Sequence, residues 1–170
     1  MAGFDTYLQI DGVEGEALDD KHKNWIELVA FNHQMTQPVS QTRSSAGGAT
    51  TGRTVHGDLI IHKYVDKASP KLYEAVSTGK HFKKMKIEVC RAGGSQVKFL
   101  EITLEEVLIS SVQMDSHSAA GSSDKGDSLP TESVSLNYGK IEWVYTQQKR
   151  ADGSGGGNVT AKYDLTAGKA

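Results

Sequence analysis

The stretch "SSAGGATTGRT", residues 44–54, contains residue types that cradle a phosphate group in nucleotide-binding enzymes. From Gly47 it reads G-x-x-x-x-G-R-T, which differs from the P-loop pattern by having Arg53 in place of lysine. Such a loop binds phosphate only between a buried strand and a helix, because the helix N-terminus supplies N–H groups and a positive dipole end. Here the preceding segment is polar and contains Pro38, and residues 55–64 alternate like a strand. We therefore predict no nucleotide site, and we expect added ATP to have no effect.

A second pattern, "GDSL" at residues 126–129, resembles the nucleophile block of the GDSL hydrolases. That family places its serine near the N-terminus and a histidine base near the C-terminus. No histidine follows His117 in this chain, so Ser128 lacks the general base that would activate it. Turn chemistry explains this glycine, aspartate and serine, followed by Pro130, better than catalysis does. A small serine hydrolase using Ser128 stays open as an alternative, and it predicts ester turnover that Ser128→Ala abolishes.

Two further groups of side chains could suggest chemistry. His56, Asp58 and His62 share one strand face, but the last two would lie about 13 Å apart, too far to bind one ion. Cys90 is the single cysteine, and a reactive thiol needs neighbours that lower its pKa. Lys86 and Glu88 share its strand face and have opposing effects, so we predict an unreactive, packed cysteine. We expect no metal and no cofactor.

Composition limits the class of protein. Lys and Arg total 19 against 21 for Asp and Glu, so no basic surface for nucleic acid or acidic lipid is indicated. With 170 residues, of which 37% are hydrophobic, the chain suits one globular domain spanning 1–170. No apolar run approaches the ~20 residues of a membrane span, and "MAGFDTYLQI" lacks the features of a Sec signal peptide. We expect a cytoplasmic origin and neither nucleic-acid nor membrane partners.

The elements that would carry these residues are mostly strands. "HFKKMKIEVC" alternates, with Met85, Ile87 and Val89 on one face and charged residues on the other. "NWIELVAF" is apolar on both parities, and its β-branched and aromatic content predicts a strand buried on both faces. Including these, about eight strands are expected. The other segments are "FDTYLQI", "TVHGDLIIHKY", "KFLEITLE", "EVLISSVQM", "SVSLNYGKIEWVY" and "NVTAKYDL".

One short amphipathic helix is predicted over residues 69–79. Ser69 is placed at its N-cap, Pro70 at its first position and Gly79 at its left-handed end. Leu72 and Ala75 then share one face with Val76, at helical spacing. Loops rich in Gly, Ser and Thr are expected at 36–53, 115–131 and 149–157.

Several blocks, in order, resemble the haemolysin-coregulated protein (Hcp) family, the tube protein of bacterial type VI secretion. The opening "FDTYLQIDGVEGEALDDKHKNWIEL" and the loop "GGATTGR" are similar to that family. "KYVDKASPKLYEAVSTGKHF" resembles its K-Y-x-D-K-x-S-P-x-L helix and G-K-H-F exit. "RAGG", "ITLEEVLISSV" and "TESVSLNYGKIEWVY" match its later strands. The resemblance covers residues 4–148, and the tail, 149–170, with its last strand, is the least diagnostic part.

The resemblance implies two β-sheets closing into a compact barrel or sandwich, with one flanking helix. It also implies a ring of six identical subunits, and rings with complementary faces can stack into a hollow tube. In the family this tube is expelled by a contractile sheath and is capped by a spike protein on a baseplate. It carries and chaperones small effector proteins in its lumen. The protein would be cytoplasmic before firing and secreted afterwards, with no catalysis; a monomeric β binding module is the other alternative.

The resemblance also gives the long loop a role. Residues 36–53 are rich in hydroxyl groups and glycine, so they could dock one ring onto the next; they could equally be a mobile hairpin tip. Asn32, after Phe31, occupies the small polar position that in the family lies toward the channel, although an ordinary polar strand residue fits as well. The loop residues expected at the contact between rings are Thr42, Arg43, Ser44, Ser45, Gly47, Gly48, Gly52 and Arg53.

Overall fold

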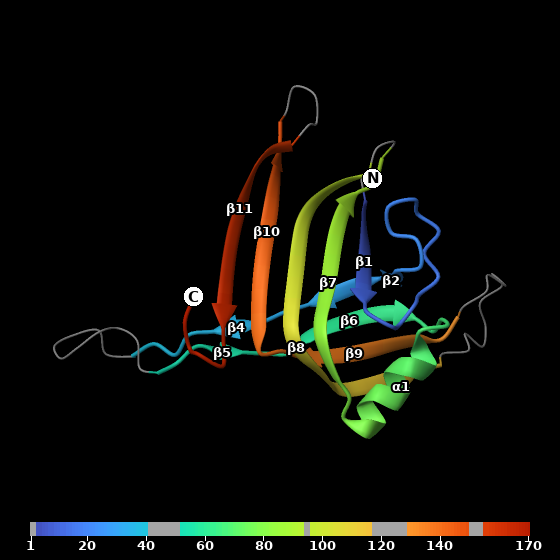
Figure 1. Cartoon of the computed structure of the whole chain (residues 1–170), viewed down its shortest axis with the longest axis horizontal. Helices are drawn as coiled ribbons and strands as arrows, with labels where there is room; N and C mark the ends of the chain where they lie inside the picture. Colours follow the sequence, from blue (N-terminus) through green and yellow to red (C-terminus); the bar gives the residue numbers. More distant parts are fainter. Residues whose placement is uncertain (1–2, 41–51, 94–95, 117–128, 150–154) are drawn as a thin grey trace.

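The computed structural model describes residues 3–40, 52–93, 96–116, 129–149 and 155–170, and within these ranges the chain is mostly β with one helix (Figure 1). The predicted class is therefore confirmed. None of the helices in these ranges combines the length and apolarity needed to cross a membrane. The elements are β1 (Phe4–Ile10), β2 (Ile26–Leu28), β3 (Ala30–Asn32), β4 (Met35–Thr36), β5 (Val55–His56), β6 (Leu59–Tyr64), α1 (Ser69–Thr78), β7 (His81–Arg91), β8 (Val97–Asp115), β9 (Thr131–Asn137), β10 (Lys140–Gln148) and β11 (Gly155–Asp164).

Nine strands form one branched sheet, and β4 and β5 form a separate hairpin. The main path runs β2-β1-β7-β8-β9-β6-β3, and β10 and β11 branch from β8. In Figure 1, β1, β7, β10 and β11 run together in front of β2, β6 and β9, which cross behind them. The expected closure of two sheets into a barrel is not confirmed, because this hydrogen-bonded path is open between β2 and β3. Those two strands follow each other along the chain, and the Val29 N–H between them donates to the His62 carbonyl at 2.8 Å.

Strand β8 replaces two strands predicted from the sequence. One edge of β8 pairs with β7, while the other pairs with β10 over Leu100–Glu105 and then with β9 over Leu108–Asp115. Glu106, at the change of partner, has a left-handed φ of 54°. As at a β-bulge, this one residue shifts the in–out alternation of the strand by one position. Even-numbered apolar residues before it and odd-numbered ones after it therefore face the same core. The buried side chains on its two sides are Ile102, Leu104, Val107 and Ile109.

The segment predicted as one strand buried on both faces is also different. It forms β2 and β3, broken at Val29. In β2 the burial alternates, with Ile26 and Leu28 inside and Glu27 exposed. The apolar residues of the opposite parity, including Val29, are exposed or half-buried because the chain changes pairing partner there.

Helix α1 packs Leu72 and Ala75 into the core and ends at Gly79, whose φ is 66°, as predicted. Its N-cap is Ala68 and not Ser69, with no side-chain cap bond. The reason is that the Ser69 hydroxyl is used elsewhere: it accepts the Asp66 N–H at 3.0 Å and donates to Glu132 Oε1 at 2.7 Å. The Asp66 carboxylate accepts the Ala68 N–H at 2.9 Å, which closes the turn before the helix.

A buried ionic cluster ties α1 to the sheet. The side chains of Lys63 on β6 and Glu132 on β9 are both fully buried, and Lys63 Nζ donates to Glu132 Oε1 at 2.6 Å. The same ammonium donates to Asp66 Oδ1 at 2.8 Å, and Tyr73 of α1 donates to Glu132. Burial alone would raise the pKa of Glu132, but hydrogen bonds from Lys63, Tyr73 and Ser69 outweigh it and hold that pKa below its usual value.

Candidate functional site

A polar surface covers the outer side of β3, β6, β9 and the second half of β8. Pairing in register places outward side chains in rows across these strands, while alternate residues such as Ile61 and Val134 fill the core. The surface carries mainly hydroxyl, amide and imidazole groups, and we call it the polar face. Its members are Asn32, Ile60, His62, Ser111, Gln113, Ser133 and Ser135.

Hydrogen bonds fix the side chains of the polar face. Asn32 Nδ2 donates to His62 Nε2 at 3.2 Å, so the imidazole N–H is on Nδ1 and donates to Ser133 Oγ at 2.9 Å. Ser111 Oγ donates to Ser135 Oγ at 3.0 Å. The resulting surface is polar and held in place, with Asn32 exposed at the edge formed by β3 and Gln113 donating to Asp115 Oδ1 at 3.2 Å.

A shallow groove of about 330 Å³ lies beside Asn32. Asp58, in its wall, accepts hydrogen bonds from Ser110 at 2.5 Å and Asn137 at 2.9 Å. The structure therefore gives the three residues considered for a metal separate partners: Asp58 binds these two groups, His62 binds Ser133, and His56 points to another cluster.

The hairpin of β4 and β5 forms the base of the long loop. Gln37 holds the two arms together, because its Nε2 donates to the Gly52 carbonyl at 2.7 Å and its Oε1 accepts from Thr54. Three apolar side chains on these arms are exposed: Met35 by 47%, Val39 by 61% and Val55 by 60%. In Figure 1 the hairpin lies at the opposite end of the molecule from α1.

Most of the loop residues predicted to contact another ring lie outside the described residues: Thr42, Arg43, Ser44, Ser45, Gly47 and Gly48. Ser128 of the hydrolase alternative lies outside them as well. Gly52 and Arg53 are described, and both are exposed. The segment after Arg53 forms strands β5 and β6 and not a helix, as the argument against a phosphate site requires.

Two histidines and a tyrosine join the hairpin to the sheet. Tyr138, in the turn between β9 and β10, lies with its hydroxyl 2.6 Å from His33 Nε2 and 2.9 Å from His56 Nδ1. The His56 ring stacks on Tyr163 of β11. Burial lowers the pKa of both histidines, and His56 lowers that of His33 further. Burial, with the charge of Asp58, raises the pKa of Tyr138, so all three groups are neutral at pH 7.

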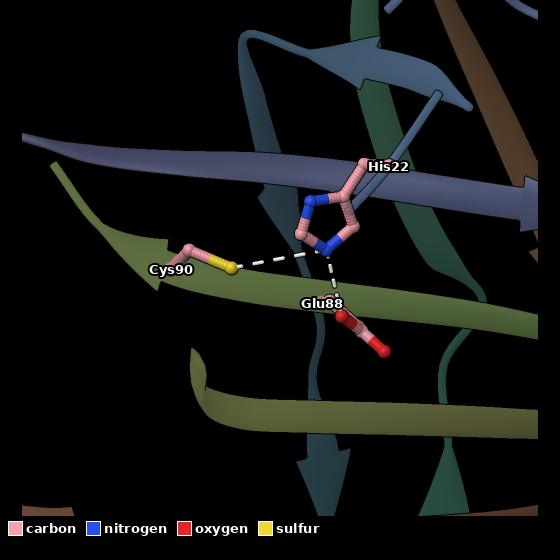
Figure 2. A group of neighbouring side chains, drawn as sticks. All are labelled: His22, Glu88 and Cys90. Carbon is pink, nitrogen blue, oxygen red and sulfur yellow. Dashed lines mark hydrogen bonds and ion pairs between the residues drawn. The ribbon is translucent and has the colours of Figure 1, made fainter. Parts of the chain in front are cut away.

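A second cluster surrounds Cys90, where the segment between β1 and β2 packs on β7 (Figure 2). His22 is 2% exposed; its Nδ1 lies 2.5 Å from Asp19 Oδ1 and its Nε2 lies 2.7 Å from Glu88 Oε2. Cys90 Sγ lies 4.0 Å from the same Nε2. Burial, with the charges of Glu88 and Asp19, raises the pKa of the Cys90 thiol to about 11, which agrees with the predicted unreactive cysteine.

Sequence reasoning did not find either histidine cluster. His22 and Cys90 are 68 positions apart, and His33 and Tyr138 are 105 apart, so no local spacing connects them. The only sequence signal for the first was the "HK" pair inside the N-terminal block that resembles the Hcp family.

Comparison with known proteins gives consistent results. Residues 7–145 match the family described as "Type VI secretion system effector, Hcp". The chain is 38% identical over 162 residues to "Protein hcp1" of Pseudomonas aeruginosa, covering 95% of this chain and 94% of that protein. It is 30% identical over 135 residues to the "Major exported protein" of the same organism, covering 77% and 74%.

Solved structures agree with the sequence comparison. One, described as the "Structure of a type six secretion system protein", has a TM-score of 0.88 at 30% identity, covering 98% of this chain and 99% of that one. Hcp1 from Salmonella typhimurium has a TM-score of 0.74 at 28% identity, covering 98% and 97%.

Proposed function

The chain belongs to the Hcp family of type VI secretion proteins, and from this membership we propose that six copies form a ring, that rings stack into a hollow tube and that the tube carries small effectors. It acts as a structural protein and not as an enzyme. Before firing, the tube assembles in the cytoplasm on the baseplate, beneath the spike protein. Contraction of the sheath then expels it, which is how a chain of this kind leaves the cell.

The observation that carries the ring proposal is the edge of β11. This strand is ten residues long and pairs with β10 along one side, while no strand in the described ranges pairs with its other side. A long strand with one free edge is a template for another chain, and a monomeric protein normally protects such an edge. Tyr145 and Val159 add exposed apolar surface on the same pair of strands, 45% and 69% exposed. A head-to-tail contact that closes by rotation would cover this edge six times, with the flank of α1 also in the seam.

Light scattering coupled to size-exclusion chromatography tests the ring. We expect a particle near six times the 18.4 kDa mass of the chain, and annular particles in negative-stain images at micromolar protein. A monodisperse particle of one chain mass would refute the ring and favour a monomeric binding module. Val159→Lys should dissociate the ring, while Val39→Lys on an arm of the hairpin should leave its mass unchanged.

The polar face is proposed as the wall of the lumen. Its neutral hydroxyl and amide groups give a cargo protein weak, replaceable hydrogen bonds, so cargo can bind and later leave. Asn32→Gln should keep the ring mass and lower the recovery of co-purified effector, because the longer side chain intrudes on the groove beside it. Unchanged recovery of the effector would remove Asn32 from the lumen.

The loop carried by β4 and β5 is proposed to dock one ring onto the next. Fixing the backbone of a residue costs roughly 1–2 kcal/mol, so one docking contact made by this loop is weak, whereas six contacts act together. The exposed Met35 and Val55 supply apolar surface at its base. Gly48→Asp, or deletion of residues 44–49, should leave a ring of normal mass and thermal stability that no longer forms tubes or supports secretion. Dissociation of the ring would instead place the loop within the ring interface, and tubes of undiminished length would make it a mobile tip.

A further inference from the structure

Three potential metal ligands meet where the N-terminal segment packs on β7. His22 Nε2, Glu88 Oε2 and Cys90 Sγ all lie within 4.8 Å of one another (Figure 2). Glu88 and Cys90 come from β7, and His22 comes from the segment between β1 and β2. We propose that these three side chains form a zinc site, which we call the His22 site.

The distances suit a tetrahedral ion after small shifts. Zinc binds nitrogen and oxygen at about 2.0–2.2 Å and sulfur at about 2.3 Å, which places neighbouring ligand atoms about 3.3–3.7 Å apart. In the His22 site the nitrogen–oxygen distance is 2.7 Å and the nitrogen–sulfur distance is 4.0 Å. These values lie on either side of the tetrahedral spacing. Opening the first and closing the second by about half an ångström would admit the ion, provided that Glu88 Oε2 and Cys90 Sγ, which lie within 4.8 Å of each other, also reach the tetrahedral spacing.

The surroundings already orient the histidine as a ligand. Asp19 Oδ1 lies 2.5 Å from Nδ1, and a carboxylate in this position keeps a proton on Nδ1, so that Nε2 is the nitrogen that would bind a metal. The Tyr7 ring stacks on the imidazole with centroids 4.2 Å apart, and Trp25 packs edge-on at 4.9 Å. The imidazole is therefore held by two aromatic rings with Nε2 directed at Glu88 and Cys90, and the metal would lie on that side.

The donor set selects the kind of ion. Thiolate excludes the hard ions that prefer oxygen, carboxylate is a poor match for copper(I), and zinc accepts nitrogen, oxygen and sulfur together. Binding replaces the proton shared by Nε2 and Glu88 and the thiol proton of Cys90; both leave to solvent, and no electron is transferred. Zinc is then neutralised by one thiolate and one carboxylate. Glu88 is the most exposed of the three ligands, at 14%, so a water molecule can complete the coordination from its side.

Zinc at this position would fasten the segment that carries Asp19, His22 and Trp25 to β7. It would add to the hydrogen bonds that already order the segment itself, such as the one that the Ala17 N–H donates to the Trp25 carbonyl at 3.0 Å. Because all ligands come from one chain, zinc binding does not depend on ring formation. Its failure would therefore leave the proposed tube function untouched.

Cobalt(II) titration of the chelator-treated full-length chain tests the site directly. Since Cys90 is the single cysteine, any thiolate-to-cobalt charge-transfer absorption comes from this residue alone. We expect the band to saturate at one equivalent, with the visible intensity of a tetrahedral ion, and zinc to displace it. Zinc, but not magnesium, should also raise the thermal midpoint of the wild-type chain. Absence of the band, or of saturable micromolar binding, overturns the proposal.

Four variants separate the His22 site from surface binding. Cys90→Ser should abolish the charge-transfer band, and Glu88→Gln should weaken binding by more than tenfold. Asp19→Asn should weaken binding about 10–100-fold, the usual effect of losing a group that orients a ligating histidine. His81→Gln, on the same strand but exposed, is the matched control and should bind as wild type does. Equal binding by the wild type, Glu88→Gln and Asp19→Asn, each folded by circular dichroism, overturns the assignment even if Cys90→Ser fails to fold.

Discussion

Replacing Lys63 by methionine tests the buried ionic cluster. Methionine keeps the length of the side chain but removes the ammonium that pairs with Glu132 at 2.6 Å and Asp66 at 2.8 Å. Both Lys63 and Glu132 are fully buried, so the variant leaves a carboxylate without its cation inside the protein. Breaking a buried pair in this way costs about 3–5 kcal/mol. For a domain of this size that lowers the thermal midpoint by roughly 10 °C.

The chain offers a matched control at an exposed ion pair, three residues after the end of β6. Lys67 lies 3.4 Å from Glu14, with side chains 46% and 69% exposed, so Lys67→Met should change the free energy of unfolding by less than about 1 kcal/mol. The double variant Lys63→Met/Glu132→Leu should cost less than the sum of its single variants, because the unpaired charge is gone.

Urea denaturation at one fixed protein concentration measures these differences, since assembly would otherwise shift the apparent stability. Acid gives a second signature. The pKa of Glu132 is lowered in the folded chain, so its contribution is complete above the ordinary carboxyl pKa and is lost as the pH falls through the lowered one. The difference in the free energy of unfolding between wild type and Lys63→Met should therefore become smaller as the pH falls through that range. A cost for Lys63→Met below about 1 kcal/mol at pH 7, or equal to that of Lys67→Met, refutes the reasoning.

Two further predictions concern the hairpin base and the N-terminal segment. The pKa values of His33 and His56 are lowered in the folded chain. As the pH falls below about 6.5, the unfolded chain therefore binds protons before the folded chain does, and the free energy of unfolding decreases until the pH reaches the lowered pKa values. Urea midpoints that do not fall between pH 7 and 5 would contradict this. Gly15→Ala would place its Cβ 2.3 Å from the Trp25 carbonyl oxygen, a backbone atom, and should cost at least about 1–3 kcal/mol. Gly3→Ala meets nothing within 4 Å and should unfold at the wild-type temperature; equal melting of the two variants would contradict the steric argument.

Alternation predicted the structure well where one face of a strand is buried and the strand keeps its partners. In β7, Met85, Ile87 and Val89 are buried as expected. The same reasoning failed at Glu106 and at Val29. At both positions the strand changes its pairing partner, and pairing between distant segments leaves no mark in a local period of two.

The side-chain clusters were less predictable than the strands. The block K-Y-x-D-K-x-S-P marked Lys63, Asp66 and Ser69 as a group, and the structure shows that they share one ionic cluster. Their fourth member, Glu132, is 69 positions from Lys63; alternation in β9 places it on the buried face with Val134 and Leu136, but its charge argues against burial. A charged residue is normally read as exposed, and only its buried partner explains the exception.

The pairing of β1 with β7 constrains the order in which the chain can fold. In this ladder Phe4 pairs with Arg91, which is far away in the sequence. By contrast, β7, β8 and β9 are neighbours both in the sequence and in the sheet. Closing a long loop costs more entropy than closing short ones, so we expect the ladders from β7 onward to form first and β1 to join them last. On the ribosome, β1 emerges well before its partner and has only the three residues of β2 to pair with meanwhile. Pulse-labelled hydrogen exchange during refolding should then protect the amides of β7 and β8 before those of β1, and a nascent chain without β7 is the form most exposed to aggregation.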